Sequence, residues 1–185
     1  MAVVVVGGQS RKVGKTSVVC GLIAALPEMR WTAIKLTQHE PIEPVAGLPP
    51  SILLREEQDR SSGTDSSRYL DAGADRAFWV RVPPGHLAAQ MPKIRELISG
   101  AENTILESNS ILEFLHPDLA LCVLDPAMAD WKPSALLCME RADALLAPEG
   151  SEVLMESRPT FSFRASQYVT AELAAFVSAR CAQKP

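Results

Sequence analysis

Hydrophobic residues along this chain occur either in short continuous runs or at every third or fourth position. The runs predict strands, and the three-to-four-residue spacing predicts helices. Residues 1–6 include four consecutive valines, a run typical of a short strand buried on both faces. Over 15–26 the apolar residues recur every three or four positions, as Val18 and Leu22 do, which predicts a helix that ends before Pro27. The apolar residues of 31–36 then predict a second strand.

The rest of the chain continues this alternation. We expect helices over 65–72, 87–98, 134–141 and 170–182. We expect strands over 76–82, 103–107, 119–125, 144–147 and 160–163, the last at an edge of the sheet. Strands that alternate with helices predict one α/β domain over residues 1–185, with three layers around a mainly parallel sheet.

Residues 40–64 do not follow this pattern. They contain Pro41, Pro44, Pro49 and Pro50, two glycines and a charged run over 55–60. We expect a long mobile loop here, with a short helix near 52–59. Loops of this length in compact domains commonly serve as functional lids.

Composition narrows the function classes. Hydrophobic residues make up 47% of the 185 residues, which is enough to bury a core. A net charge of −4 argues against broad nucleic-acid binding, which needs a basic surface. No apolar run approaches the ~20 residues of a membrane span or forms a secretion signal, so we expect a cytoplasmic protein with no membrane partner. The four cysteines and three histidines are scattered, which is typical of reduced thiols rather than of a zinc cluster.

The segment between the first strand and the first helix carries the clearest chemistry. It reads Gly7-Gly8-Gln9-Ser10-Arg11-Lys12-Val13-Gly14-Lys15-Thr16-Ser17. The pattern matches the phosphate-binding motif G-x-x-x-x-G-K-[ST], except that the loop is one residue longer because Gln9 occupies the first glycine position. We therefore expect a nucleoside triphosphate to contact Gly8, Gln9, Ser10, Arg11, Lys12, Val13, Gly14, Lys15, Thr16 and Ser17.

Each residue type in this loop has a physical reason. Backbone N–H groups at a helix start have no partner, and the helix dipole adds positive potential there. Gly14 allows the backbone to approach the phosphates closely, and Lys15 can reach the terminal phosphate. The hydroxyl of Thr16 can bind a Mg²⁺ ion that bridges two phosphates.

A carboxylate is also expected near the metal, at the end of a strand beside the loop. Glu107 and Asp125 both follow predicted strands, and we favour Glu107 as the metal ligand that accompanies Thr16. Either acid can instead cap a helix or a turn. The same two roles remain open for Asp65, which begins a predicted helix and could position metal or water. Lys35 and His39 follow the second strand and could face the same crevice.

Several segments resemble a known family. The long phosphate loop resembles that of dethiobiotin synthetase, in the wider class that contains nitrogenase iron protein and MinD. The later segments are similar to MobB, the molybdopterin-guanine dinucleotide biosynthesis protein B. They are Ile34-Lys35-Leu36-Thr37-Gln38-His39, Gly63-Thr64-Asp65-Ser66-Ser67-Arg68, Ala72-Gly73-Ala74 and Leu106-Glu107-Ser108.

The resemblance implies a P-loop NTPase in which Lys15 and Thr16 bind phosphate and Mg²⁺ while Asp65 and Glu107 line the same site. It also implies binding and slow hydrolysis of GTP or ATP, a homodimer, and assistance to a molybdenum cofactor nucleotidyltransferase. The sequence has no Asn-Lys-x-Asp signature of guanine recognition, so it does not distinguish GTP from ATP as the ligand. Two alternatives remain: an ATP-dependent synthetase or small-molecule kinase of the dethiobiotin type, and a non-catalytic module that senses nucleotide.

Overall fold

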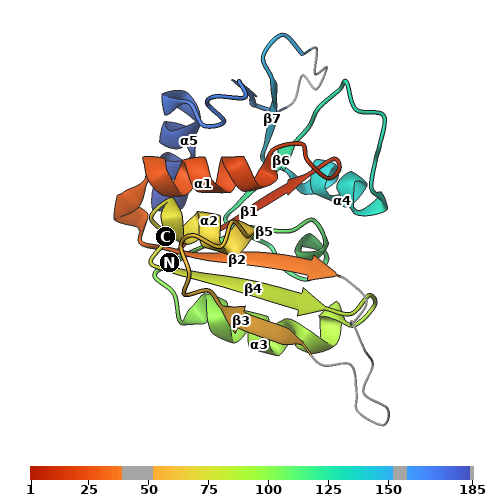
Figure 1. The fold of residues 1–185 in the computed structure, drawn as a ribbon. Helices are drawn as coiled ribbons and strands as arrows, with labels where there is room; N and C mark the ends of the chain where they lie inside the picture. The colour runs from red at the N-terminus through yellow and green to blue at the C-terminus, as the bar shows by residue number, and fades with distance from the viewer. Residues whose placement is uncertain (39–51, 152–157, 184–185) are drawn as a thin grey trace.

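The structure, a computed structural model, describes residues 1–38, 52–151 and 158–183 and arranges them around one eight-stranded sheet (Figure 1). The strands are β1 (Val3–Gly8), β2 (Trp31–Gln38), β3 (Leu53–Glu56), β4 (Arg76–Val82), β5 (Asn103–Glu107), β6 (Leu119–Val123), β7 (Ala144–Pro148) and β8 (Thr160–Phe163). The helices are α1 (Lys15–Ala25), α2 (Asp65–Asp71), α3 (Leu87–Ser99), α4 (Pro133–Arg141) and α5 (Ala171–Ala182), with short 3-10 turns η1 (Pro27–Met29) and η2 (Ser110–Glu113).

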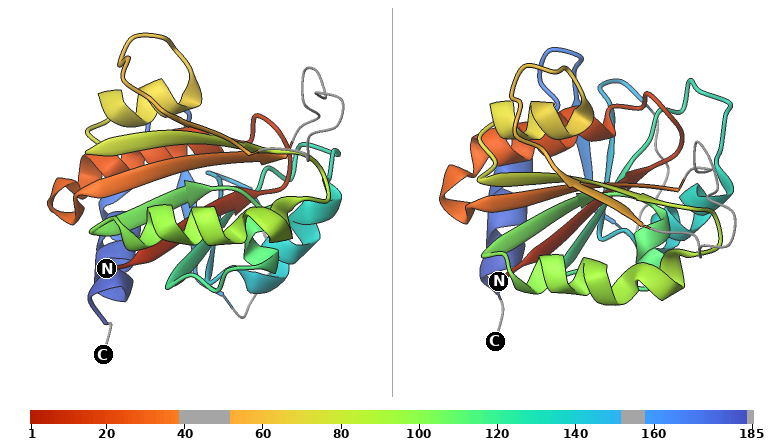
Figure 2. Two further views of the ribbon diagram at one scale, coloured as in Figure 1. Left: turned by 90° about the horizontal axis from the view of Figure 1, so that it is seen from below. Right: turned by 60° about the horizontal axis from the view of Figure 1, so that its bottom comes forward.

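The helices cover both faces of the sheet and make the three layers expected from the sequence. Helices α1, α2 and α5 pack on one face and α3 and α4 on the other (Figures 1 and 2). Successive side chains of a strand point to opposite faces, so Val4 and Val6 enter one core cluster while Val3 and Val5 enter the other. Burial on both faces explains why β1 is a continuous run of valines.

The order of the strands is β3-β4-β2-β5-β1-β6-β7-β8, and every pairing except that of β3 with β4 is parallel. Strand β1 lies between β5 and β6, with Val6 opposite Glu107 on one side and Leu121 on the other. From β1 the chain crosses to β2 on one side, and from β5 it crosses to β6 on the other. Ligands of open α/β sheets gather at the carboxyl ends of strands at such a reversal of direction.

Most predicted elements are present, which confirms the α/β class with a mainly parallel sheet, but the short helix expected near 52–59 is wrong. This segment forms β3, an edge strand antiparallel to β4, with Leu54 opposite Val80 and Arg55 opposite Trp79. Its pairing with β4 outweighs the charged, helix-like composition of 55–60. The predicted loop over 40–64 lies partly outside the described residues. In the ranges that the structure describes, no helix is long and apolar enough to cross a bilayer.

Candidate functional site

The start of α1 is left open toward solvent. Gly14 is its N-cap residue, no side chain caps it, and its first turn holds no acidic residue. Lys12 and Gly14 have φ angles of 67° and 103°, and left-handed residues at alternate positions turn successive N–H groups toward one side of a loop. Within the described ranges, no atom accepts a hydrogen bond from the backbone N–H groups of residues 11–14. The loop therefore presents a concave row of unpaired donors.

Gly14 is also required by its surroundings. A Cβ atom on residue 14 would lie 2.3 Å from Cε1 of Tyr168. A larger residue would therefore fit at this position only if the tyrosine ring moved. Tyr168 itself stacks on Phe163 with ring centroids 4.8 Å apart, so it has little freedom to move. The glycine of the motif thus serves both the left-handed backbone and the close approach of Tyr168.

The first residues of the loop anchor it to the neighbouring strands. Asn109 accepts a hydrogen bond from the Gly8 N–H (2.7 Å) and donates one to the Gly8 carbonyl (2.8 Å). The buried Gln9 side chain donates to the Met128 carbonyl (2.6 Å) and accepts from the Asp125 N–H (2.9 Å), while its own N–H donates to the Val123 carbonyl. These hydrogen-bonding groups of Gly8 and Gln9 are thus engaged within the protein, and their expected contacts with a nucleotide stay a prediction that the geometry does not favour.

The side chains of Ser10 and Val13 do not line the site. The Ser10 hydroxyl is buried and donates to the Arg11 carbonyl (3.1 Å), and the Val13 side chain packs in the core. The other six residues of the motif, Arg11, Lys12, Gly14, Lys15, Thr16 and Ser17, line a cavity of about 820 Å³. These six, together with the backbone N–H of Val13, are the phosphate contacts that the geometry favours.

This phosphate cavity is strongly cationic. Of the described residues that line it, Arg11, Lys12, Lys15, Lys35, Arg68 and Lys132 are basic, whereas Asp65 and Glu107 are acidic. The ammonium group of Lys15 donates to the Ser10 carbonyl (2.5 Å), and burial lowers its pKa. A polyphosphate is the kind of ligand that matches such an excess of positive charge.

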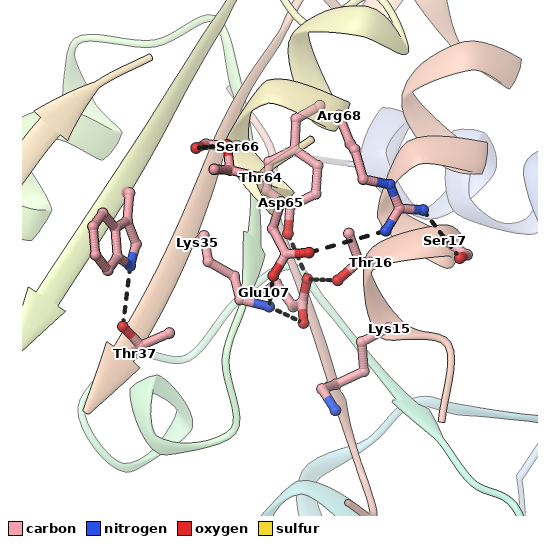
Figure 3. A network of polar contacts seen from close by, with 12 residues as sticks. Lys15, Thr16, Ser17, Lys35, Thr37, Thr64, Asp65, Ser66, Arg68 and Glu107 are labelled. Atoms are coloured by element: carbon pink, nitrogen blue, oxygen red, sulfur yellow. Dashed lines mark hydrogen bonds and ion pairs between the residues drawn. The ribbon is translucent and has the colours of Figure 1, made fainter. Parts of the chain in front are cut away.

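Glu107, which is 3% exposed, lies at the centre of a polar cluster on one wall of the cavity (Figure 3). Its Oε1 atom is 2.5 Å from the Lys35 ammonium, and its Oε2 atom accepts hydrogen bonds from Thr16 (2.8 Å) and Tyr69 (2.5 Å). Burial first, and then the negative charge of Glu107, raise the pKa of Tyr69 well above its ordinary value, so the phenol stays a donor.

Asp65 belongs to the same cluster and does not cap α2. The cap is Thr64, whose hydroxyl accepts from the Ser67 N–H (3.2 Å). The Asp65 carboxylate instead lies 2.8 Å from the Lys35 ammonium and 4.0 Å from Arg68 (Figure 3). Burial raises its pKa and the hydrogen bond from Lys35 lowers it, and the net result is a pKa below the ordinary value. Of the two roles left open for Asp65, the structure thus favours a place in the site.

The Thr16 hydroxyl lines the cavity and can offer its oxygen to Mg²⁺, because it donates its hydrogen to Oε2 of Glu107 (2.8 Å) and keeps its lone pairs. Both acceptor positions of that Oε2 atom are taken by Thr16 and Tyr69, so the predicted direct contact of Glu107 with the metal would require one of these hydrogen bonds to break. Among the described residues no cluster of three or more acidic, cysteine or histidine side chains could hold a metal alone. A Mg²⁺ ion here would need phosphate oxygens as further ligands, which is its usual mode of binding.

Asp125, the rival candidate, lies outside this cavity. Its Oδ1 atom accepts a hydrogen bond from the Ala127 N–H (3.1 Å), which is a turn role. Sequence reasoning missed Tyr69, Lys132 and Tyr168. Only Tyr69 had a usable signal, because it is four residues after Asp65 and so on the same face of α2. His39 lies outside the described residues.

A loop of unpaired amides between the central parallel strand and its helix, with Gly14-Lys15-Thr16 at the helix start, defines the P-loop NTPase fold. Comparison with solved structures gives a MobB protein homolog from Bacillus stearothermophilus, with a TM-score of 0.54 and 14% identity over 100% of both chains. It also gives LpxK from Aquifex aeolicus in complex with ATP, with a TM-score of 0.55 and 22% identity over 86% of this chain. The chain spans only 53% of that LpxK chain.

These likenesses show the fold alone: the chain has the α/β architecture of the MobB homolog and of LpxK, which confirms the fold expected from the resemblance in the sequence. No family model matches the sequence, and no curated protein matches it.

Proposed function

We propose that this protein binds a nucleoside triphosphate with Mg²⁺ in the phosphate cavity and hydrolyses it slowly. The observation that carries the proposal is the uncapped start of α1, where unpaired N–H groups and the Lys15 ammonium face a cavity with six basic residues. The phosphates would lie along residues 11–17, with the terminal phosphate nearest to Lys15. Preorganised donors of this kind stabilise the charge that develops in phosphoryl transfer.

The polar cluster has distinct roles in this proposal. Because Thr16 donates its hydroxyl hydrogen to Glu107, the lone pairs of its oxygen are free for a cation. Glu107 then acts through Thr16, since both acceptor sites of its Oε2 atom are taken by Thr16 and Tyr69. Mg²⁺, when bound, would supply charge neutralisation of the phosphates. Asp65 would orient the attacking water, because its carboxylate lines the same cavity.

We further propose that the protein uses GTP or ATP to assist assembly of the molybdenum cofactor, as a cytoplasmic homodimer beside a nucleotidyltransferase. The order of the MobB-like motifs supports this role, as does the alignment with the whole of the MobB homolog. A test is nucleotide attachment to molybdopterin by the nucleotidyltransferase of the same organism, with and without this protein. An unchanged rate of attachment would exclude the role and leave nucleotide binding intact.

The experiment that tests nucleotide binding compares the wild type with Lys15→Ala, using calorimetry with ATP and GTP and excess Mg²⁺. We expect the variant to lose at least about 100-fold in affinity, because one charge-assisted contact to phosphate is worth about 3 kcal/mol. Lys93→Ala, an exposed change on α3 across the sheet, is the matched control and should bind like the wild type. Equal affinities of Lys15→Ala and the wild type, with both folded by circular dichroism, would refute the proposal.

A second candidate function, phosphoryl transfer to a small molecule by a synthetase or kinase, is favoured by one observation. A second, smaller cavity shares Lys35, Thr37 and Asp65 with the phosphate cavity. A kinase or synthetase would release nucleoside diphosphate rapidly only when its second substrate is present. The hydrolase proposed above would release nucleoside diphosphate at the same slow rate whether or not a second substrate is present.

A further inference from the structure

The second cavity has a volume of about 280 Å³ and lies between the end of β2, the edge strand β3, its neighbour β4, and the start of α2. The described residues that line it are Lys35, Thr37, Arg55, Glu57, Thr64, Asp65, Ser66 and Trp79. Lys35, Thr37 and Asp65 also line the phosphate cavity, so the two cavities adjoin at these residues. A molecule in the second cavity would reach the end of the phosphate cavity that holds Glu107.

One wall of the second cavity is held rigid by Glu57, which is 7% exposed. Its Oε1 atom accepts hydrogen bonds from the N–H groups of Gln58 and Asp59, both at 3.1 Å. Its Oε2 atom accepts from the hydroxyls of Ser66 (2.9 Å) and Thr64 (3.1 Å). Four donors satisfy this carboxylate, so Glu57 shapes the cavity and leaves its other groups to bind a ligand.

Those groups are an indole and a guanidinium. The indole N–H of the half-buried Trp79 donates to the Thr37 hydroxyl (3.2 Å), so only the apolar ring surface of Trp79 remains for a ligand. Arg55 lies opposite Trp79 in the register of β3 and β4 and is exposed. The Arg55 side chain lines the second cavity, and within residues 1–38, 52–151 and 158–183 no hydrogen bond or ion pair engages it.

We propose that the second cavity binds the second substrate of the nucleotide-dependent reaction, a small anionic molecule with a flat apolar or aromatic body. The body packs on Trp79, the anionic group pairs with Arg55, and the polar end reaches Lys35 and Asp65. The inference rests on nucleotide binding in the neighbouring cavity and on the second candidate function, phosphoryl transfer to a small molecule. Lys35 lines both cavities, so a ligand in one cavity is expected to change the affinity of the other cavity for its ligand. Such coupling is reciprocal: each ligand changes the affinity of the other by the same factor.

The test uses four named probes that match this description: benzoate, 4-hydroxybenzoate, 1-naphthoate and indole-3-propanoate. Saturation-transfer NMR and calorimetry are run on the full chain with each probe up to about 5 mM, a range that detects weak binding. At least one probe is expected to bind, and Trp79→Ala and Arg55→Gln should each weaken that binding about tenfold. Trp131→Ala and Lys93→Gln, which change an exposed tryptophan and an exposed lysine outside the cavity, should leave it unchanged.

Two results would overturn the inference. One is the absence of binding by all four probes, and the other is equal binding by the wild type and Arg55→Gln. Arg55 is exposed, so its variant keeps the fold even if Trp79→Ala is destabilised. Each probe is measured with and without Mg·ATP, and we expect reciprocal changes of about fivefold that Lys35→Met abolishes. The lack of any coupling would refute the placement beside the nucleotide.

These measurements separate the two proposals. If a probe binds through Trp79 and Arg55 while ATP and GTP do not bind at all, the cavity stands as a ligand site and the proposed nucleotide function falls. If ATP binds through Lys15 and no probe binds, the nucleotide function stands and the second cavity falls.

Discussion

The replacement of Lys35 by methionine tests the polar cluster most directly. Methionine keeps a long unbranched apolar stem and removes the ammonium that lies 2.5 Å from Glu107 and 2.8 Å from Asp65. Glu107 is 3% exposed, so water cannot replace the lost partner without a change in the packing around it. The variant therefore leaves a buried carboxylate with its Oε1 atom unpaired.

The expected cost follows from the partners that remain. Removal of one member of a buried ion pair commonly costs about 3–5 kcal/mol, because the other charge stays uncompensated. Thr16 and Tyr69 still donate to Oε2 of Glu107, so the cost should fall at the lower end of that range. We expect Lys35→Met to lower the free energy of unfolding by about 3 kcal/mol.

Urea unfolding of the nucleotide-free protein at neutral pH gives this free energy, and a double-mutant cycle isolates the pair. Glu107→Gln removes the buried charge, so the double variant should be more stable than the sum of the two single losses by about 2 kcal/mol. Lys93→Met on the exposed face of α3 is the control and should change stability by less than about 0.5 kcal/mol. Additive losses in the cycle would show that Lys35 and Glu107 do not act as a pair and would refute the reasoning.

Three further predictions concern other parts of the site. Gly14→Ala should lower the free energy of unfolding by about 2 kcal/mol and reduce nucleotide affinity, because its Cβ meets Tyr168, and the added truncation Tyr168→Ala should recover part of the stability. Gln9→Ala should cost about 2 kcal/mol in urea unfolding, because it leaves the Met128 carbonyl and a neighbouring N–H without partners, and Gln9→Glu should not restore the loss, because a carboxylate cannot donate. Hydrogen bonds, first that from the Asp59 N–H, hold the pKa of Glu57 below its ordinary value of 4.5, so the stability that Glu57 adds is present at neutral pH and is lost as the pH falls through the depressed pKa. Unfolding midpoints measured from about pH 6 to pH 3 should therefore fall less steeply for Glu57→Gln than for the wild type, and parallel curves would contradict this.

The sequence was sufficient for the parts of the site that depend on local pattern. Four consecutive valines favour a strand covered on both faces, and a Gly-Lys-Thr segment at the beginning of a helix places free amides at the helix start. Parallel strands end at one edge of the sheet, so Glu107 and Asp125 were both predicted near the loop. Glu107 is the last residue of β5, so the strand itself positions it. Strand β6 ends at Val123, and Asp125 lies beyond it in a turn.

Other features depend on contacts between distant segments, and no local pattern contains them. Gln9 reads as a phosphate contact because of its place in the motif, yet its two ends fit the carbonyl of Met128 and the N–H of Asp125. The position of Tyr69 four residues after Asp65 places both on one face of α2, but its hydrogen bond to Glu107 appears only when α2 packs over β2 and β4. Strand β3 exists because β4 offers an open edge, which a run of charged residues does not predict.

The charge balance of the polar cluster constrains how a cation can enter the site. Lys35 faces Glu107 because the register of β2 and β5 places the two residues side by side, and it also pairs with Asp65. In the absence of ligands both carboxylates are therefore paired with one ammonium, and Asp65 has Arg68 beside it as well, so free Mg²⁺ would have to compete with cations that are covalently fixed in the site. Mg²⁺ that arrives with a triphosphate brings most of its ligands and its own compensating charge, so it needs only the Thr16 hydroxyl and can leave the ion pairs intact. The arrangement thus favours the metal–nucleotide complex over the free ion, and titration of the apo protein with Mg²⁺ alone should show weak binding where Mg·ATP binds tightly.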